Sequence, residues 1–245
     1  MSITSRQEQI LNILNERTFL TVNELSRLTF TSPSSIRRDL TYLQNNGFVQ
    51  RTHGGVSLPS PIKGVASFYD RSKKNIREKR MIAQKASALL KDGQSIILDS
   101  SSTATFLLPH IAQLNSVKVF TNNLSTALAA IELGIKTNCL GGWSVNRSVV
   151  LSSADTYQAI SNIRADILFF SSQSLDAEGN ISDSTEEENY MRKLMLQSAK
   201  KSVFLCDHEK FDSSSLYRLC HVDDVDGVVF DQPFAALHTK HKILP

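Results

Sequence analysis

The segment Ser32–Leu40, with the sequence SPSSIRRDL, has the residue types and the spacing of a helix that reads DNA. Ser32 can cap the first free backbone N–H groups of a helix, and Pro33 suits the first helical position because it has no N–H to lose. Apolar residues then recur at i, i+4 and i+7, and they are Ile36, Leu40 and Leu43. This spacing predicts a single apolar stripe that faces a core.

The polar residues of the same helix point away from that stripe. Short hydroxyls and guanidinium groups on a free helix face suit the base edges and phosphates of a DNA groove. In this helix they are Ser34, Ser35, Arg37, Arg38 and Thr41. We predict that these residues contact the major groove, and that Arg51 and His53, from a following hairpin, contact the DNA backbone.

The surrounding sequence supplies the elements that would position this helix. Ile10, Leu11, Ile13 and Leu14 have helical spacing. Thr21–Glu24 is a capping box for a helix that runs to about Thr29, and a short turn then leads to Ser32. Gly47 is suited to a left-handed helix C-cap, and Phe48–Gly55 is typical of a wing. Residues 1–58 are therefore predicted to form a winged helix-turn-helix domain.

The remaining chain predicts a second domain of the α/β class. Residues 59–67 contain two prolines and a glycine without an apolar period, and they are predicted to be a linker. In residues 68–245, short apolar runs alternate with helical patterns. The predicted strands are 95–98, 117–120, 137–140, 167–170, 202–205 and 227–230, and the predicted helices are 103–113, 124–133, 155–162 and 185–199. This alternation predicts a mainly parallel sheet with helices on both faces.

Small and polar residues follow most of these strands, where open α/β sheets bind ligands. The segment Asp99–Thr103 leads directly into a helix, so that its hydroxyl and N–H groups could hold a phosphate. Arg147 and Lys210 could add positive charge. The residues predicted to bind a small anionic effector are Asp99, Ser101, Ser102, Thr103, Asn122, Gly141, Gly142, Arg147, Gln173 and Lys210.

The net charge of +3 is distributed unevenly along the 245 residues. Residues 1–58 carry six Lys and Arg against four Asp and Glu, residues 59–91 carry nine against two, and residues 92–245 carry twelve against eighteen. The basic charge lies toward the N-terminal end, which favours a polyanionic partner there. The winged helix alone is only mildly basic, so we expect a homo-oligomer, a dimer or a dimer of dimers, to bind DNA. The basic helix within 68–91 is read either as a solvated face or as an accessory phosphate-contacting surface.

Composition favours the cytoplasm. No apolar run approaches the ~20 residues of a membrane span, and no signal peptide is recognisable. The three cysteines, Cys139, Cys206 and Cys220, are odd in number and scattered, so a disulfide framework is not expected.

Residues 5–60 resemble the DNA-binding domain of the DeoR family of bacterial repressors, through IRRDL at 36–40 and HGGV at 53–56. Residues 68–231 resemble the effector domain of that family, which is similar in fold to ribose-5-phosphate isomerase. The matching segments are DSSST at 99–103, TNNL at 121–124, LGG at 140–142, NR at 146–147 and DHEKF at 207–211, and Glu188 falls on the helix glutamate of the family. NR is the pair found in the glycerol-3-phosphate repressor branch.

The resemblance implies a repressor of a carbohydrate-use operon that responds to a phosphorylated sugar, with Glu188 as a further effector residue. The chain departs from the family pattern at Ser171–Ser174, where a GADG-like turn is common, and at Ser152–Ser153, where Gly-Pro or Gly-Glu is common. No cofactor, metal or enzyme activity is expected.

Three alternatives remain open at the level of sequence. A sugar-phosphate isomerase would need a base, and Gln173 cannot act as one, although Asp99, Glu188 and Asp207 could. A metal sensor could use Cys206, His208, Cys220 and His221, although their spacing matches no zinc pattern. A DNA-binding protein whose second domain no longer senses a ligand is the third alternative.

Overall fold

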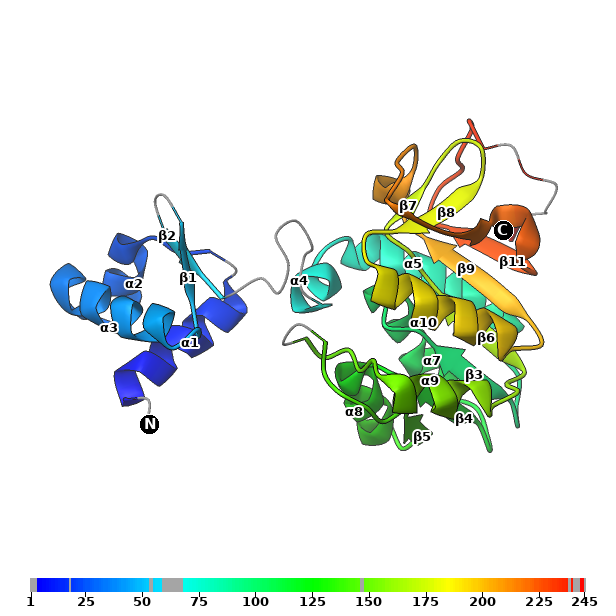
Figure 1. Cartoon of the computed structure of the whole chain (residues 1–245), viewed down its shortest axis with the longest axis horizontal. Coiled ribbons are helices and arrows are strands. Elements are labelled where there is room, and N and C mark those ends of the chain that lie inside the picture. Colours follow the sequence, from blue (N-terminus) through cyan, green and yellow to red (C-terminus); the bar gives the residue numbers. More distant parts are fainter. Residues whose placement is uncertain are drawn as a thin grey trace. The chain divides into compact units, whose positions relative to one another are not determined.

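The chain forms two compact units, Met1–Asp70 and Arg71–Pro245 (Figure 1). The computed structural model describes residues 4–17, 19–52, 55–58, 68–145, 148–237, 239 and 243–244. The predicted linker at 59–67 and the predicted site residues His53 and Arg147 lie outside these ranges.

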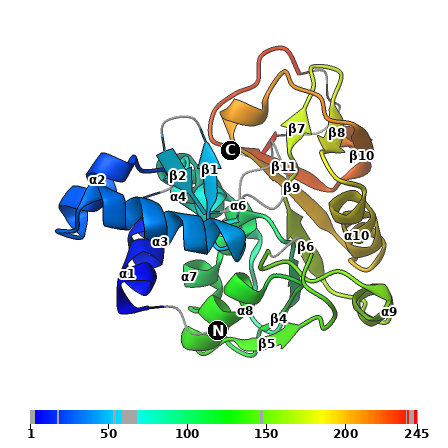
Figure 2. The same cartoon turned by 60° about the vertical axis from the view of Figure 1, so that its left-hand side comes forward.

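The first unit is a winged helix. Its helices and strands are α1 (Ser5–Glu16), α2 (Val22–Leu28), α3 (Pro33–Asn45), β1 (Gln50–Thr52) and β2 (Gly55–Ser57). The two strands pair antiparallel, and Leu20 adds a bridge to Val56. The three helices and the hairpin are seen together in Figure 2. The predicted stripe of Ile36, Leu40 and Leu43 is buried in the core of this unit.

The predicted helix ends of this unit are confirmed. The Ser32 hydroxyl accepts the N–H of Ser35, and Pro33 is the first residue of α3. Thr21 and Glu24 form the predicted capping box. Gly47 has a φ of 73°, and the N–H of Phe48 reaches back to the carbonyl of Leu43 at 2.8 Å, which together form a Schellman ending. Local sequence alone therefore fixes where α3 begins and ends.

Gly55 is required where the hairpin approaches the chain before α2. A Cβ at this position would lie 2.7 Å from the carbonyl oxygen of Leu20 and against the ring of Phe19. We expect Gly55→Ala to destabilise this unit by about 1–3 kcal/mol, because the backbone must shift. Gly141→Ala is the control, since nothing lies within 4 Å of the added methyl group. Thermal unfolding of both variants measures the difference, and equal melting temperatures would contradict the assignment.

The second unit is built on a sheet of seven parallel strands, in the order β12-β11-β9-β6-β3-β4-β5. The strands are β3 (Ser95–Leu98), β4 (Lys118–Thr121), β5 (Lys136–Cys139), β6 (Ile167–Phe170), β9 (Ser202–Cys206), β11 (Gly227–Phe230) and β12 (Ile243–Leu244). The mainly parallel sheet predicted from the sequence is confirmed. Because successive strands are added on one side of β3 and then on the other, the topology reverses between β3 and β6.

Helices cover both faces of this sheet. These helices are α5 (Ile76–Ala86), α6 (Ser102–Thr105), α7 (Leu108–Ile111), α8 (Leu124–Glu132), α9 (Ala154–Ser161) and α10 (Glu186–Gln197), and α4 (Phe68–Lys73) precedes them at the boundary between the two units. Helices α5, α7 and α8 share a core with Ile96 and Leu98, whereas α9 and α10 share the other core with Ile97. Figure 1 shows α9 and α10 in front of the sheet. The alternation along β3 follows from the two-residue period of a strand.

The structure corrects the predicted elements in three places. Strand β12 was not among the six predicted strands. The predicted helix 103–113 is two short helices, α6 and α7, and Pro109 lies in the first turn of the second, where proline is tolerated. A small sheet that was not predicted contains β7 (Ser174–Leu175), β8 (Asn180–Asp183) and β10 (Tyr217–His221), paired antiparallel in the order β10-β8-β7.

Candidate DNA-binding surface and effector site

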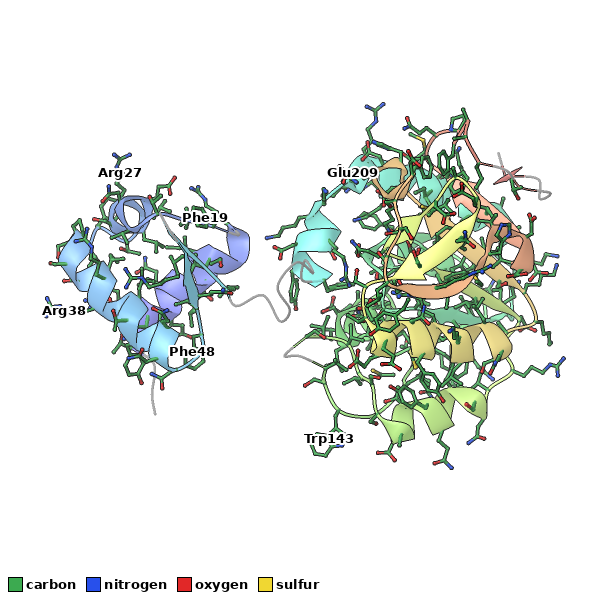
Figure 3. The ribbon with its side chains drawn as sticks, turned by 45° about the horizontal axis from the view of Figure 1, so that its top comes forward. Phe19, Arg27, Arg38, Phe48, Trp143 and Glu209 are labelled. Atoms are coloured by element: carbon green, nitrogen blue, oxygen red, sulfur yellow. The ribbon has the colours of Figure 1, made fainter. Side chains whose placement is uncertain are left out.

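Helix α3 presents a polar stripe on the side opposite its buried residues. Ser34, Arg37, Arg38 and Thr41 are exposed and fall at i, i+3, i+4 and i+7. Arg38 points away from the body of its unit, as does Arg27 from the end of α2 (Figure 3). An exposed stripe of hydroxyl and guanidinium groups at the start of a helix can contact bases and phosphates together.

The remaining predicted DNA-binding residues lie at the start of α3 and in the wing. Ser35 is half-buried, and its hydroxyl accepts a hydrogen bond from the Ser32 hydroxyl at 3.0 Å. Arg51 is exposed on β1, where its backbone is opposite Val56. The helix stripe and the wing strand thus belong to one compact unit.

Asp39 lies within the same motif but faces the core. Its carboxylate accepts from Arg6 Nε at 2.5 Å and from Gln7 Nε2 at 3.3 Å, which ties α1 to α3. Asp39 is nearly fully buried, whereas Arg6 is partly exposed. The sequence analysis gave Asp39 no role, and the available signal was its helical position three residues after Ile36 and four before Leu43, on the apolar side of the helix. We assign it to positioning α3.

Most of the predicted effector residues that the structure describes lie at the carboxyl edge of the parallel sheet, whose topological switch falls between β3 and β6. Asp99 follows β3 and is fully buried. Its carboxylate accepts the N–H of Ser101 at 3.1 Å and the N–H of Ser171, which follows β6, at 3.3 Å. Asp99 therefore joins the loops on the two sides of the switch rather than standing free for a ligand.

Arg192 on α10 is the central charge beneath this edge, and the sequence analysis missed it. Its Nε lies 2.8 Å from Asp99 Oδ2, and its Nη1 lies 2.8 Å from Asp183 Oδ1 and 3.5 Å from Glu188. Burial alone would lower the pKa of Arg192, but the carboxylates of Asp183, Asp99 and Glu188 outweigh it and raise that pKa. For the carboxylate of Asp183 burial acts in the opposite direction and raises the pKa. This buried ion cluster holds the switch region together.

Two predicted effector residues carry polar atoms that are buried without a hydrogen-bond partner. They are Thr103 Oγ1 and Asn122 Oδ1. Both residues are about 1% exposed, and Asn122 Nδ2 donates to the carbonyl of Leu151 at 2.9 Å. Buried polar groups are nearly always paired, so unpaired acceptors at a strand edge favour a site for a donor-bearing ligand or water. The hydroxyl of Ser101 instead caps α6 by accepting the N–H of Ala104.

The pair Gly141–Gly142, predicted to bind the effector, also has a packing role. Gly142 has a φ of 125°, and a Cβ there would collide with the side chains of Thr156 and Ser153 at the start of α9. The carbonyl of Gly141 accepts from the hydroxyl of Thr156 at 2.5 Å. The pair therefore brings the loop after β5 close to α9.

The turn after β9 connects this edge to the beginning of the second unit. Lys210 Nζ donates to the hydroxyl of Ser171 at 2.7 Å and lies 3.7 Å from Asp207 Oδ2. On its other side, Asp207 Oδ1 accepts from Asn75 Nδ2 at 3.1 Å, and Glu209 forms an ion pair with Lys74. One short turn thus contacts both the effector edge and the segment that joins α4 to α5.

The other predicted effector residues are more peripheral. Gln173 is exposed, and only its backbone N–H bonds to Asp183, at 3.2 Å. Glu188 is held near Arg192 in the ion cluster.

The four side chains of the metal-sensor alternative do not converge. His208 Nδ1 lies 2.5 Å from Asp231, and His221 Nε2 lies 2.6 Å from the carbonyl of Glu178. In the part of the chain that the structure describes, no group of three His, Cys, Asp or Glu side chains could hold a metal ion. Cys139, Cys206 and Cys220 are free thiols in the structure.

The basic helix α5 is only partly a solvated surface. Lys79 is buried, and its Nζ donates to the carbonyls of Arg71 and, at 2.7 Å, of Lys74. Lys85 Nζ donates to the carbonyl of Phe230 at 3.0 Å. Some of the positive charge counted in the sequence therefore holds the second unit together and is not available to DNA.

Burial lowers the pKa of Lys79 to about 8, against the opposing effect of Asp207. The unfolded chain releases this proton only near pH 10.5, so between these values the unfolded state binds more protons than the folded state. The free energy of unfolding should therefore rise with pH across this range in the wild type relative to Lys79→Met. Urea titrations at pH 7, 8, 9 and 10 measure the difference. Parallel profiles for the two proteins would contradict the assignment.

Both units match models of one protein family. Residues 6–61 match the DeoR-like helix-turn-helix domain, and residues 74–232 match the DeoR C-terminal sensor domain. The chain belongs to the DeoR family. The resemblance inferred from IRRDL and HGGV is thereby confirmed, and this DeoR-family protein is a DNA-binding transcriptional regulator rather than an enzyme.

Curated relatives of this DeoR-family regulator extend over nearly its whole length. The HTH-type transcriptional regulator GolR of Listeria innocua is 33% identical, covering 92% of this chain and 89% of the relative. The L-fucose operon activator of Haemophilus influenzae is 31% identical, covering 93% and 91%. The glycerol-3-phosphate regulon repressor of the same organism is 25% identical, covering 92% and 88%. Of these three relatives, one is named as a repressor and one as an activator.

Solved structures are similar in fold. The delta subunit of eIF2B from Chaetomium thermophilum has a TM-score of 0.50 and 13% identity, covering 94% of this chain and 71% of that one. Ribose 5-phosphate isomerase A from Methanocaldococcus jannaschii has a TM-score of 0.43 and 19% identity, covering 56% and 55%. At these identities the similarity concerns the fold alone. Among the described residues, no helix combines the length and the apolar character needed to cross a membrane.

Proposed function

We propose that this DeoR-family regulator is a repressor of a carbohydrate-use operon whose DNA binding responds to a phosphorylated sugar. The observation that carries the proposal is the pairing of an exposed arginine and hydroxyl stripe on α3 with a polar strand edge at the switch point of a separate sensor unit. Relatives named as regulators of the glycerol-3-phosphate regulon and of an L-fucose operon support the metabolic assignment. Since operator DNA lies in the cytoplasm, the protein acts there.

In this proposal the operator is read by α3 and held by the wing. Ser34, Ser35, Arg37, Arg38 and Thr41 contact the major groove, while Arg51 and His53 contact the backbone. The winged helix carries only six basic residues against four acidic ones. One copy neutralises few phosphates, so the regulator binds as a dimer or a dimer of dimers on repeated half-sites.

The effector site in this proposal is the carboxyl edge near β3 and β4. Ser101, Ser102, Thr103 and Asn122 supply hydroxyl and amide groups for the ligand, and Lys210 supplies positive charge for its phosphate. The outer part of the site is formed by Gly141, Gly142, Arg147 and Gln173. Asp99 and Glu188 position the loops through Arg192.

Ligand binding at Lys210 offers a direct route toward the DNA-binding unit. A phosphate would compete with Ser171 and Asp207 for the Lys210 ammonium group. The turn that holds Lys210 also holds Asn75 and Lys74, which follow α4. A shift of this turn would therefore alter the segment closest in sequence to the predicted linker, which couples the two sites.

The test is a thermal-shift panel of sugar phosphates, each paired with its unphosphorylated sugar. A ligand at 100 times its Kd should raise the melting temperature by about 5–10 °C. The double variant Ser102→Ala with Lys210→Ala should lose this response, and Lys201→Ala, an exposed lysine of the same unit, should keep it. A response to the free sugar equal to that to its phosphate would contradict the proposed ligand class, and no response to any member would favour a domain that no longer senses.

A further inference from the structure

Helix α8 has an apolar face that the described residues of its own unit leave exposed. Leu124, Leu128 and Ile131 recur at i, i+4 and i+7 and are 45%, 59% and 58% exposed. Ala127 and Ala130, on the other side of the helix, are buried against the sheet. The helix is therefore apolar on both sides, which is typical of a helix that is buried all round.

Other helices of the same unit do not share this pattern. Helix α10 presents Glu186, Glu187 and Lys193 to solvent. In α8, by contrast, Glu132 at the last position is the only charged residue. The outer face of α8 therefore differs in kind from an ordinary solvated helix surface.

The surroundings of α8 extend the same surface. Leu133 directly follows the helix and is also exposed, and Trp143, which is 78% exposed, belongs to the loop whose Val149 carbonyl accepts the N–H of Leu124. Figure 3 shows Trp143 projecting from the unit. Helix α8 packs on β5, which is the outermost strand at one end of the seven-stranded sheet that the structure describes. Figure 1 shows the two elements side by side.

We propose that the α8 face, defined by Leu124, Leu128, Ile131 and Leu133, is where a second copy of this chain binds. The unit that carries α8, residues 71–245, has twenty basic residues against nineteen acidic ones, so no appreciable net charge opposes the approach of a second copy. The almost uncharged α8 face is complementary to the same apolar face of another copy, and its lack of positive charge excludes DNA as the occupant. This inference rests on the proposed function, which requires two DNA-binding units in one assembly.

The geometry of the stripe suits two-fold symmetry. Leu128 lies in the middle of the stripe, with Leu124 and Ile131 on either side. Around a two-fold axis near Leu128, Leu124 of one copy would meet Ile131 of the other, as an isologous interface requires. A patch of these side chains covers on the order of a few hundred Å², which is the size of functional apolar patches on monomers. The edge of β5 and the Trp143 loop can supply the remaining area that a stable interface needs.

The experiment is sedimentation velocity on the full chain in three forms. The wild type should sediment as a dimer or a larger even assembly, and Leu128→Glu should halve the mass of that assembly. Leu216→Glu is the matched control, because Leu216 is 81% exposed on another loop of the same unit, and it should sediment as the wild type. A monomeric wild type, or a Leu128→Glu variant with unchanged mass, would overturn the inference.

A second variant covers the case in which the new charge prevents folding. Leu128→Cys adds no charge and should give a covalent dimer with a bifunctional maleimide, whereas the wild type and Leu216→Cys should not. Absence of that product from a dimeric Leu128→Cys protein also overturns the inference. If the Leu128→Cys protein gives no cross-linked product but binds operator DNA as an intact dimer, the proposed function holds and the dimer uses a different interface. If the wild type binds no DNA fragment, the proposed function itself is wrong.

Discussion

Arg38→Ala should weaken binding to operator DNA about 10- to 100-fold, and the double variant with Arg37→Ala should weaken it further. The two guanidinium groups are exposed on α3 and are not tied to a core residue, so that their loss removes DNA contacts without removing packing. A good base contact contributes about 1–3 kcal/mol, which corresponds to this range. Fluorescence anisotropy with a labelled operator fragment measures the change.

The salt dependence of binding separates the two roles that Arg38 could have. Loss of a phosphate contact lowers the slope of log K against log salt by about one, whereas loss of a base contact leaves the slope and relaxes the preference for operator over unrelated DNA. Arg218→Ala serves as control, because Arg218 is an exposed arginine on β10 of the other unit. Equal affinities for Arg38→Ala, Arg218→Ala and the wild type would exclude α3 as the reading helix.

Arg192→Met should destabilise the second unit by about 3–5 kcal/mol, the cost typical of breaking a buried ion pair from one side. The variant leaves Asp99 and Asp183 buried without their cation, and both are within 1% of complete burial. The pKa of the Asp183 carboxylate, which burial already raises, should rise further without this cation, because burial disfavours the charged form. The unfolded chain then binds fewer protons than the folded variant, so the deficit should be largest at pH 8 and shrink toward pH 5.

Denaturant titrations at the two pH values measure this deficit. Lys193→Met on the same helix is the matched control, because Lys193 is exposed and its loss should change stability by less than about 0.5 kcal/mol. Arg192→Lys should fall between Arg192→Met and the wild type, since it keeps the charge but loses the fork geometry. If Arg192→Met and Lys193→Met were equally stable, the ion cluster would not hold the switch region together.

Features that depend on neighbouring residues were predictable from the sequence. The Ser32 cap, the Thr21–Glu24 capping box and the Gly47 ending of α3 each involve atoms a few residues apart. The central strands β3, β6, β9 and β11 were also predictable, because they are almost wholly buried and appear as apolar runs. For that reason β3 and β6 lie where the sequence placed them, and β4 and β5 differ by one residue.

Features that depend on distant residues were not predictable. Arg192 looks like an ordinary helical arginine until the fold brings Asp99 and Asp183 beside it. The sequence analysis counted Lys79 as surface charge. Its burial depends on the path of the chain before α5, which the sequence did not predict. The small antiparallel sheet was missed because β7 has two residues and the pairing of β10 with β8 shifts register between Arg218 and Cys220. For Arg192 and for the small sheet, the deciding contacts join residues far apart in sequence, whereas for Lys79 they join it to Arg71 and Lys74, in the irregular path between α4 and α5.

The central claim is that a phosphorylated sugar at the carboxyl edge of the sheet controls DNA binding by α3. It is tested most directly by anisotropy titration of the full chain on DNA from upstream of its own gene and the adjacent genes, with and without each sugar phosphate of the panel. The account predicts that one phosphorylated sugar shifts the operator Kd at least fivefold, that its unphosphorylated counterpart does not, and that Ser102→Ala with Lys210→Ala abolishes the shift but not DNA binding. An operator Kd that no sugar phosphate changes, or a shift that survives in the double variant, would contradict it.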